Sequence, residues 1–317
     1  MDSRFDLLDY GIAFSPPRRL TDIVSWHLHI PFAFAITAML RPRTFVELGT
    51  HKGDSYCAFC QAVDELGLDT VCWAVDSWQG DEHAGFYGDA VLEELRAYHN
   101  PLYGGFSSLR RCLFDAALEF FPAGSIDLLH IDGHHAYDSV RHDFESWLPR
   151  MSERGVVLLH DTTVREGDFG VWRLWSELAR RYPSFEFPFG HGLGVLAVGA
   201  HIEAKVRAFL EYGKDHEAGV SRFFHLLGTK NELAREKDTL VKQVHQLESD
   251  LLDRDRGLQH AEEWRRQNGA MSEEKDRQLE EAKILLEEKS RRLDEIYASK
   301  GWQWLTRFRR WKAMGRV

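Results

Sequence analysis

The sequence contains few cysteines and fewer basic than acidic residues. Both features limit the classes of protein to which it can belong. Its four cysteines, Cys57, Cys60, Cys72 and Cys112, are too few for a disulfide-stapled fold and suit a reducing compartment. Cys57 and Cys60 lack the second pair that a zinc site needs, so we interpret them as apolar packing on one helix. With 40 Lys and Arg against 50 Asp and Glu, the net charge of −10 argues against nucleic-acid binding.

The sequence also lacks the early apolar run of a secretion signal, since Arg4 and two acids stand near the N-terminus. The most apolar early window, Ile23 to Leu40, contains two histidines and a proline and is short for a membrane span, so it predicts a buried helix. We therefore expect a cytoplasmic protein. Its 12% aromatic content is ample for a packed core.

Short apolar runs alternate with amphipathic segments up to about Gly228. The strand-like runs are 44–48, 71–76, 126–131, 155–160, 185–187 and 194–198. This alternation predicts an α/β domain over residues 1–228, with βαβ units on a largely parallel sheet. Because only a short glycine-rich segment joins the last two runs, we expect them to form an antiparallel pair at the sheet edge.

The first predicted strand ends in a turn that suits a cofactor. Glu47 lies at the end of the strand, and Gly49 and Gly53 lie in the turn before the next helix. Glycine lets the backbone approach a ligand closely, although a tight turn could need the same glycines for packing. The second predicted strand ends at Asp76, where an acid can bind the two hydroxyls of a ribose. Together these residues favour a nucleoside cofactor.

Polar clusters follow two further predicted strands. Asp132 and His135 come after the run 126–131, and His160 and Asp161 end the run 155–160. Neighbouring parallel strands deliver their carboxyl ends to one sheet edge, which is where open α/β folds bind ligands. Oxygen-rich side chains in such a cluster suit a hard cation such as Mg²⁺.

Taken in order, these motifs resemble the class I S-adenosylmethionine-dependent methyltransferases. The resemblance covers about residues 20–200 and rests on the segments 46–53, 74–81 and 128–135. Within that class the chain is similar to the branch that accompanies polysaccharide and glycosyltransfer genes. The resemblance implies a Rossmann-like seven-stranded sheet with the last strand antiparallel. It also implies S-adenosylmethionine as the cofactor and a sugar hydroxyl of a glycan or surface polysaccharide, such as an O-antigen, as the acceptor.

The resemblance also assigns roles to single residues. His135 would be the general base, and Asp132, His160 and Asp161 would be the ligands of Mg²⁺ or Mn²⁺. Related enzymes usually have two acids, or Asp-Asn, where this chain has His160-Asp161, or Asp161-Thr162 if the alignment shifts by one. A metal-free site with His135 alone therefore stays open. The residues expected to contact the cofactor are Glu47, Gly49, Thr50, Gly53, Ser55, Asp76, Ser77, Trp78, Asp115 and Asp132, although Trp78 could equally be a core residue.

Two glycine-bounded loops are expected to shape the acceptor pocket. One contains Asp81 and His83, and the other contains His191. Either loop could instead be a plain surface loop.

The chain becomes highly charged and nearly free of glycine and proline after Gly228. One heptad register fits residues 229–297, which predicts a coiled coil and hence a homo-oligomer. Polar residues at the seam near Gly269 predict a weak joint between two coiled segments. The apolar seam positions are Leu233, Leu240, Val244, Leu247, Leu251, Leu258, Ala261, Leu279, Ala282, Leu286, Leu293 and Ile296.

The segment 298–317 combines six basic residues and three tryptophans with no acids. This composition is typical of an interfacial helix at the inner face of a membrane, or of a docking peptide for a glycosyltransferase or exporter complex. Two other functions stay open: a non-catalytic scaffold in polysaccharide assembly, and a small-molecule O-methyltransferase of secondary metabolism.

Overall fold

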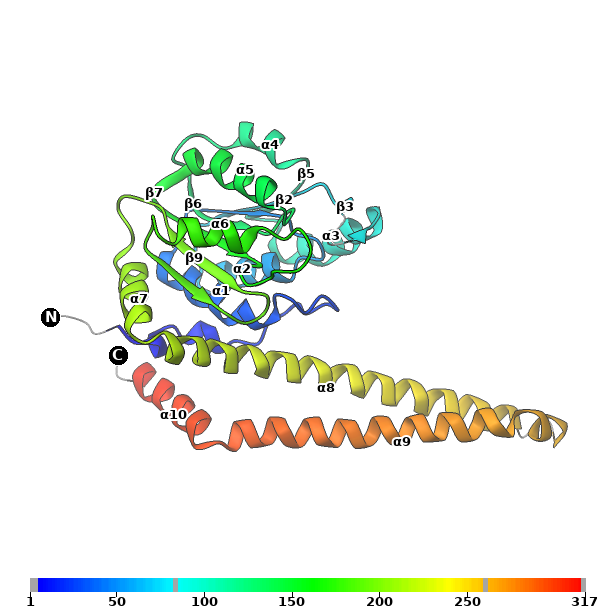
Figure 1. Ribbon diagram of the computed structural model, residues 1–317. Coiled ribbons are helices and arrows are strands. Elements are labelled where there is room, and N and C mark those ends of the chain that lie inside the picture. Colours follow the sequence, from blue (N-terminus) through cyan, green and yellow to red (C-terminus); the bar gives the residue numbers. More distant parts are fainter. Residues whose placement is uncertain (1–4, 82–84, 259–261, 315–317) are drawn as a thin grey trace. The chain divides into compact units, whose positions relative to one another are not determined.

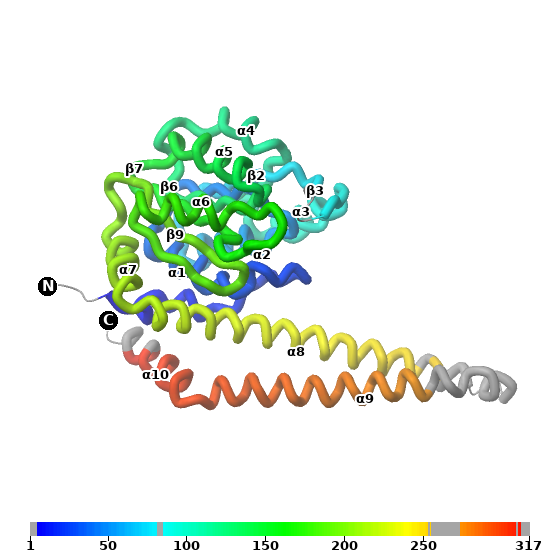
Figure 2. The backbone as a smooth tube through the Cα atoms, in the orientation of Figure 1, coloured from blue at the N-terminus to red at the C-terminus, as the bar shows by residue number. Residues whose placement is uncertain are grey.

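The computed structural model describes residues 5–81, 85–258 and 262–314 (Figures 1 and 2). The chain divides into two compact units, Met1–Gly228 and Thr229–Val317. The division falls where the amino-acid composition changes.

A seven-stranded mixed sheet forms the centre of the first unit, in the order β5-β2-β1-β6-β7-β9-β8. Strand β9 is antiparallel to both of its neighbours, and the other pairs are parallel. The predicted Rossmann-like fold with an antiparallel edge pair is therefore confirmed. The strands are β1 (Thr44–Leu48), β2 (Val71–Asp76), β5 (Ser107–Arg111), β6 (Ile126–Ile131), β7 (Met151–His160), β8 (Ser184–Phe187) and β9 (Leu193–Ala197).

Helices cover both faces of this sheet (Figure 1). The helices on one face are α1 (Ile30–Leu40), α2 (Asp54–Glu65), α3 (Asp89–Tyr103) and α7 (Ala204–Asp215). Those on the other face are α4 (Phe114–Ala117), α5 (Tyr137–Trp147) and α6 (Val171–Leu178). A small antiparallel pair, β3 (Gly80–Asp81) and β4 (Gly85–Phe86), follows β2. Short 3-10 helices lie at Leu7–Asp9, Gly11–Phe14, His27–His29, Leu118–Phe120 and Leu148–Arg150.

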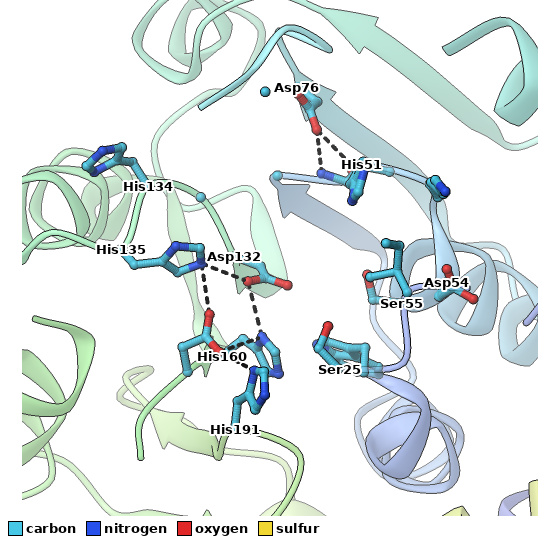
Figure 3. A pocket seen from close by; sticks show the side chains of 18 of the residues that line it. Ser25, His51, Asp54, Ser55, Asp76, Asp132, His134, His135, His160 and His191 are labelled. Atoms are coloured by element: carbon cyan, nitrogen blue, oxygen red, sulfur yellow. Dashed lines mark hydrogen bonds and ion pairs between the residues drawn. The ribbon is translucent and has the colours of Figure 1, made fainter. Parts of the chain in front are cut away.

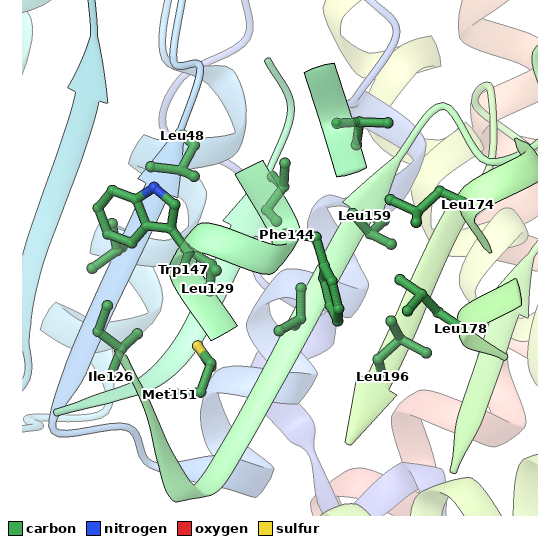
Figure 4. Packing of buried hydrophobic residues seen from close by; sticks show 14 of the residues in the cluster. Leu48, Ile126, Leu129, Phe144, Trp147, Met151, Leu159, Leu174, Leu178 and Leu196 are labelled. Carbon is green, nitrogen blue, oxygen red and sulfur yellow. The ribbon is translucent and has the colours of Figure 1, made fainter. Parts of the chain in front are cut away.

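Two apolar layers hold the site strands in place. Leu129 and Leu159 of the central strands pack against Phe144 and Trp147 of α5, where Trp147 is fully buried (Figure 4). On the opposite face α1 buries ten of its eleven residues, which agrees with the buried helix expected from the apolar window. Because helices cover both faces, all six residues of β6 are buried. Among the described residues, no helix is long and apolar enough to cross a membrane.

Two long helices, α8 (Glu217–Leu258) and α9 (Glu262–Ala298), pair with each other, and α10 (Lys300–Met314) follows them. Lys289 forms an ion pair with Glu236, and Lys275 lies 2.8 Å from Asp250. Residue numbers that rise along one helix while they fall along the other define an antiparallel hairpin, as Figure 1 shows.

The seam positions predicted from the heptads face inward on this hairpin. Val244, Leu279 and Leu293 are buried, and the other described seam residues are partly buried. The side chains of Leu258 and Ala261 lie outside the described residues. In this chain the two expected helical segments, α8 and α9, pair with each other, and the predicted homo-oligomer stays a prediction. The joint expected near Gly269 is not there, because α9 runs without a break from Glu262 to Ala298.

The hairpin predicts a crosslink within one chain. Replacing Asp250 and Lys275 with cysteine should allow a short bis-maleimide to join α8 and α9, giving a faster-migrating monomer on a denaturing gel. Each single-cysteine variant controls for reaction at Cys112, the one native cysteine that is not buried among those described. Crosslinked dimers in place of the compact monomer would contradict the hairpin.

Candidate functional site

The carboxyl ends of β1, β2, β6 and β7 open onto a cavity of about 1040 Å³ (Figure 3). Most of the predicted site residues line it. They are Gly49, Thr50, Gly53, Ser55, Asp76, Ser77, Asp132, His135, His160, Asp161 and His191. The glycine turn with Asp76 and the cluster of Asp132, His135, His160 and Asp161 therefore face one common space.

The glycine turn after β1 lies directly against the end of β6. Gly49 has a φ of +85°, and a Cβ atom there would stand 2.0 Å from the carbonyl oxygen of Asp132. The Gly49 amide donates to Val75 O at 3.0 Å, and the Asp132 amide donates to Leu48 O at 2.8 Å. Only glycine fits both the dihedral angle and the contact, so this turn brings the cofactor loop next to the acidic cluster.

Asp76 holds the shape of this turn from β2. One carboxylate oxygen accepts hydrogen bonds from the amides of Thr50, at 2.8 Å, and His51, at 2.9 Å. The other accepts from the Trp78 amide at 2.7 Å. A carboxylate oxygen has two lone pairs, so Asp76 can organise the loop and still accept a further hydrogen bond from a ligand in the cavity.

The Asp/His cluster lies where β6 and β7 end (Figure 3). His135 Nε2 lies 2.8 Å from an oxygen of Asp161 and 3.7 Å from an oxygen of Asp132. His160 Nδ1 lies 3.2 Å from the same Asp132 oxygen. Asp161 has a φ of +60°, which turns the chain at the end of β7. His191 Nδ1 approaches the second Asp161 oxygen at 3.3 Å.

Two histidines anchor the turn that carries His191. The carbonyl oxygen of Gly190 accepts hydrogen bonds from His29 Nε2, at 2.9 Å, and from His160 Nε2, at 3.0 Å. Gly190 and Gly192 have positive φ angles that permit this tight turn. As a result, the turn before β9 holds His191 beside the cavity.

The charges of this cluster compensate one another. Burial would lower the pKa of His135, but hydrogen bonds and charge from Asp132 and Asp161 raise it to about 10. Burial would also lower the pKa of His160, but the negative charges of Asp161 and Asp132 raise it to about 9. Burial opposes ionisation of both acids, yet the histidines hold the pKa of Asp132 and of Asp161 below its usual range.

Three of these residues fit a divalent cation. Asp132, His135 and Asp161 each offer one ligand atom, and these atoms lie within 4.8 Å of one another. Two carboxylate oxygens and one imidazole nitrogen are a donor set that Mn²⁺ or Mg²⁺ can accept. The expected ligand His160 is not in this trio, because one of its nitrogens faces Asp132 and the other is bonded to Gly190 O.

A flat aromatic contact fixes the plane of the His135 ring. Phe169 stacks on it with centroids 4.6 Å apart and an interplanar angle of 5°. The Gly170 amide donates to His135 O at 2.8 Å, and Ala136 bridges to Phe169. The loop after β7 therefore presents one edge of His135 to the cavity.

Three residues expected at the cofactor lie elsewhere. Glu47 is fully buried and takes a hydrogen bond at 2.8 Å from His130 Nδ1, while His130 Nε2 accepts from the Trp26 indole at 3.2 Å. Burial raises the pKa of Glu47. Glu47 thus supports β1 and β6 from the face covered by α1 and α2.

The other two corrections concern Trp78 and Asp115. Trp78 is fully buried, and its indole nitrogen donates to His51 O at 3.0 Å, so it is a core residue beneath the loop. Asp115 is exposed and pairs with His142 Nε2 at 2.9 Å. Cys112, Leu113 and Phe114, just upstream of Asp115, line the cavity instead.

The acceptor-loop residues have different outcomes. His191 lines the cavity, as expected. Asp81 ends β3, but its side chain lies outside the described part of the protein, as does all of His83.

Several cavity residues had no signal in the sequence. Ile23, Ser25 and Trp26 enter from the segment before α1, and Arg165 and Phe169 enter from the loop after β7. Thr21, upstream, is tied to Asp54 of α2 at 2.5 Å, so the N-terminal segment is attached next to the glycine turn. These residues meet only in the tertiary structure.

One segment of the chain is similar to a known family of protein domains. Residues 46–162 match the family described as Methyltransferase domain. The matched segment begins in β1 and ends after β7, so it contains both the glycine turn and the Asp/His cluster.

One curated relative and many solved structures are also similar. The chain is 51% identical over 192 residues to a Sinorhizobium fredii protein named Uncharacterized protein y4gI, a match that covers 61% of this chain and 21% of the relative. The chain thus spans about a fifth of that relative's length.

Two crystal structures illustrate the structural likeness. The SAH-bound methyltransferase PaMTH1 of Podospora anserina has 12% identity and a TM-score of 0.41, with 56% of this chain and 88% of that one covered. The O-methyltransferase TomG of Streptomyces achromogenes, in complex with SAM, has 14% identity and a TM-score of 0.41, with 63% and 100% covered.

The raised histidine pKa values predict how stability depends on pH. In chelator, protonated His135 and His160 stabilise the folded state fully below their unfolded pKa of about 6.5. That contribution is lost as pH rises through about 9 and 10. The free energy of unfolding should fall by up to about 1.4 kcal/mol per pH unit for each histidine. Urea unfolding at pH 7, 8 and 9 measures this.

A matched pair of variants isolates the cause of that slope. Asp132→Asn combined with Asp161→Asn removes the partners of both histidines and should flatten the dependence. Glu153→Gln, at an exposed ion pair with His201, should leave it unchanged. Equal slopes in the wild type and the double variant would contradict the assigned ion pairs.

Proposed function

We propose that the protein is an S-adenosylmethionine-dependent O-methyltransferase that transfers the methyl group to a sugar hydroxyl of a glycan. The observation that carries the proposal is that the glycine turn with Asp76 and the group Asp132, His135 and Asp161 open onto one cavity. The match of residues 46–162 to a methyltransferase domain supports the transferred group.

The cofactor would lie along the glycine turn. Gly49 and Gly53 leave the backbone open to close approach, and Asp76 is placed to accept hydrogen bonds from a ribose diol. The methionine end would then point toward Asp132 and Ser25. Its sulfonium methyl group would stand between the turn and the Asp/His cluster, where an acceptor hydroxyl can attack in line.

His135 is the residue suited to take the hydroxyl proton. Its ring is held flat by Phe169 and its Nε2 points at Asp161, so the nitrogen that would accept the proton faces the acidic cluster. Without a cation, hydrogen bonds and charge from the two acids raise the pKa of His135 to about 10, so its ring must lose the proton it carries at neutral pH before it can accept one from the hydroxyl. Asp132 and Asp161 would hold a divalent cation that lowers the pKa of a bound hydroxyl and replaces the charge of that proton.

The acceptor class is inferred from the polar lining and the family resemblance. Arg165, Glu166, His134 and His191 line the same cavity as the candidate base. Side chains that donate and accept hydrogen bonds suit the closely spaced hydroxyls of a sugar. A glycan acceptor also agrees with a cavity large enough for more than the cofactor.

Cofactor binding and acceptor methylation can be measured separately, and each measurement tests one part of the proposal. Calorimetry should detect S-adenosylmethionine binding to the wild type and to His135→Ala, because His135 is placed at the acceptor side. Methylation of a glycan panel, followed with labelled cofactor, should fall at least about 100-fold in His135→Ala. His201→Ala, at an exposed histidine that does not line the cavity, serves as the control.

The possible results have distinct meanings. A wild type that does not bind S-adenosylmethionine would refute the enzymatic proposal and favour a scaffold. Turnover of small alcohols but of no glycan would refute the acceptor class alone.

Metal binding can be measured without turnover. Mn²⁺ should raise the melting temperature of the wild type, since a ligand that binds only the folded state stabilises it. Asp161→Asn should lose most of this increase, whereas Asp115→Asn, at an exposed acid outside the cavity, should keep it. An equal increase in both variants would place Mn²⁺ elsewhere and leave His135 to act alone.

A further inference from the structure

Helix α10 uses one of its faces for contacts within its own unit. Trp302 is partly buried, with its ring 5.4 Å from the ring of Tyr297 at the end of α9. The ammonium group of Lys230 lies 5.2 Å from the Trp302 ring centroid. Leu305 and Thr306, on the same side of the helix, are also partly buried. These contacts fix which side of α10 faces outward.

The outward side of α10 carries a continuous aromatic strip. Trp304, Phe308 and Trp311 follow one another at helical spacing, with ring centroids 5.2 Å and 5.6 Å apart. Trp304 is 57% exposed and Trp311 is 67% exposed. Two large exposed tryptophans on one helix face are costly in water, which indicates that another surface covers them.

Basic residues lie beside this strip. Lys300, Arg307 and Arg310 are exposed, and residues 299–317 contain no acid. The chain as a whole carries a net charge of −10, so α10 has the opposite sign to the protein that bears it. The partner of this face should therefore be anionic and should accept an aromatic, apolar strip.

We propose that α10 lies on an anionic phospholipid surface, with Trp304, Phe308 and Trp311 at the level of the headgroups and Arg307 and Arg310 against the phosphates. Tryptophan is favoured at this boundary because its ring is apolar and its N–H is polar. Fifteen residues of helix span roughly 22 Å, too short to cross a bilayer, so the helix lies in the surface plane. This inference is independent of the proposed methyl transfer.

A lipid surface fits these features better than a protein groove does. The strip lies on a convex helix face with basic residues beside it, and a broad, negatively charged interface satisfies all of them at once. A nucleic acid is a poorer partner, because the remainder of the chain is acidic and would be repelled.

Vesicle co-sedimentation of the full-length protein tests the proposal. The protein should pellet with vesicles of phosphatidylcholine and phosphatidylglycerol and stay in solution with phosphatidylcholine alone. Replacing Arg307 and Arg310 with glutamate should weaken binding at least about tenfold, because each basic residue near an anionic surface contributes about fivefold. Replacing Trp304 and Trp311 with alanine should weaken it comparably.

The control variant makes the same change of charge away from α10. Lys242→Glu combined with Arg291→Glu alters two exposed residues of α8 and α9 and should bind as the wild type does. Circular dichroism melts of all three variants check that the helices stay folded.

Three results would overturn the proposal. One is a wild type that ignores anionic vesicles, and another is an α10 variant that binds as strongly as the wild type. The third comes from light scattering: an oligomer that dissociates when Trp304 and Trp311 are replaced, without vesicle binding, would assign the strip to a second copy.

Discussion

The contact between the Gly49 turn and the end of β6 is the constraint on which the rest of the site depends. Two strands that are neighbours in the sheet, β1 and β6, are joined beyond their last ladder bonds by the Asp132 amide and Leu48 O. There is no room for a side chain on Gly49 at this point. The cofactor loop and the acidic cluster consequently share one wall, and a movement of one must displace the other.

The two carboxylates of the Asp/His cluster are stabilised by the histidines beside them. At the ends of β6 and β7 Asp161 is buried and Asp132 is partly buried, which would be unfavourable for two unpaired carboxylates. His135 and His160 lie against these carboxylates. The Phe169 ring orients His135, and the carbonyl oxygen of Gly190 orients His160. The same arrangement leaves both carboxylates ionised and ready for a cationic partner.

Features that leave a pattern in a short stretch of sequence were predicted, whereas features that depend on contacts between distant residues were missed. Strands β1, β2, β6 and β7 stand out as apolar runs ending in polar residues, and the glycine turn is visible from its spacing. Strand β5 was not predicted, because the edge strand Ser107–Arg111 reads as polar. Glu47 was placed at the cofactor because nothing in the sequence shows that it faces His130 across the β1 and β6 register.

The hairpin of α8 and α9 has a consequence for how the second unit responds to dilution. Its apolar seam is covered by a segment of the same chain, so forming it is a unimolecular event whose equilibrium does not depend on protein concentration. A coiled coil between separate chains would instead loosen as the protein is diluted. The long helical unit can therefore keep its form even when few copies of the protein are present.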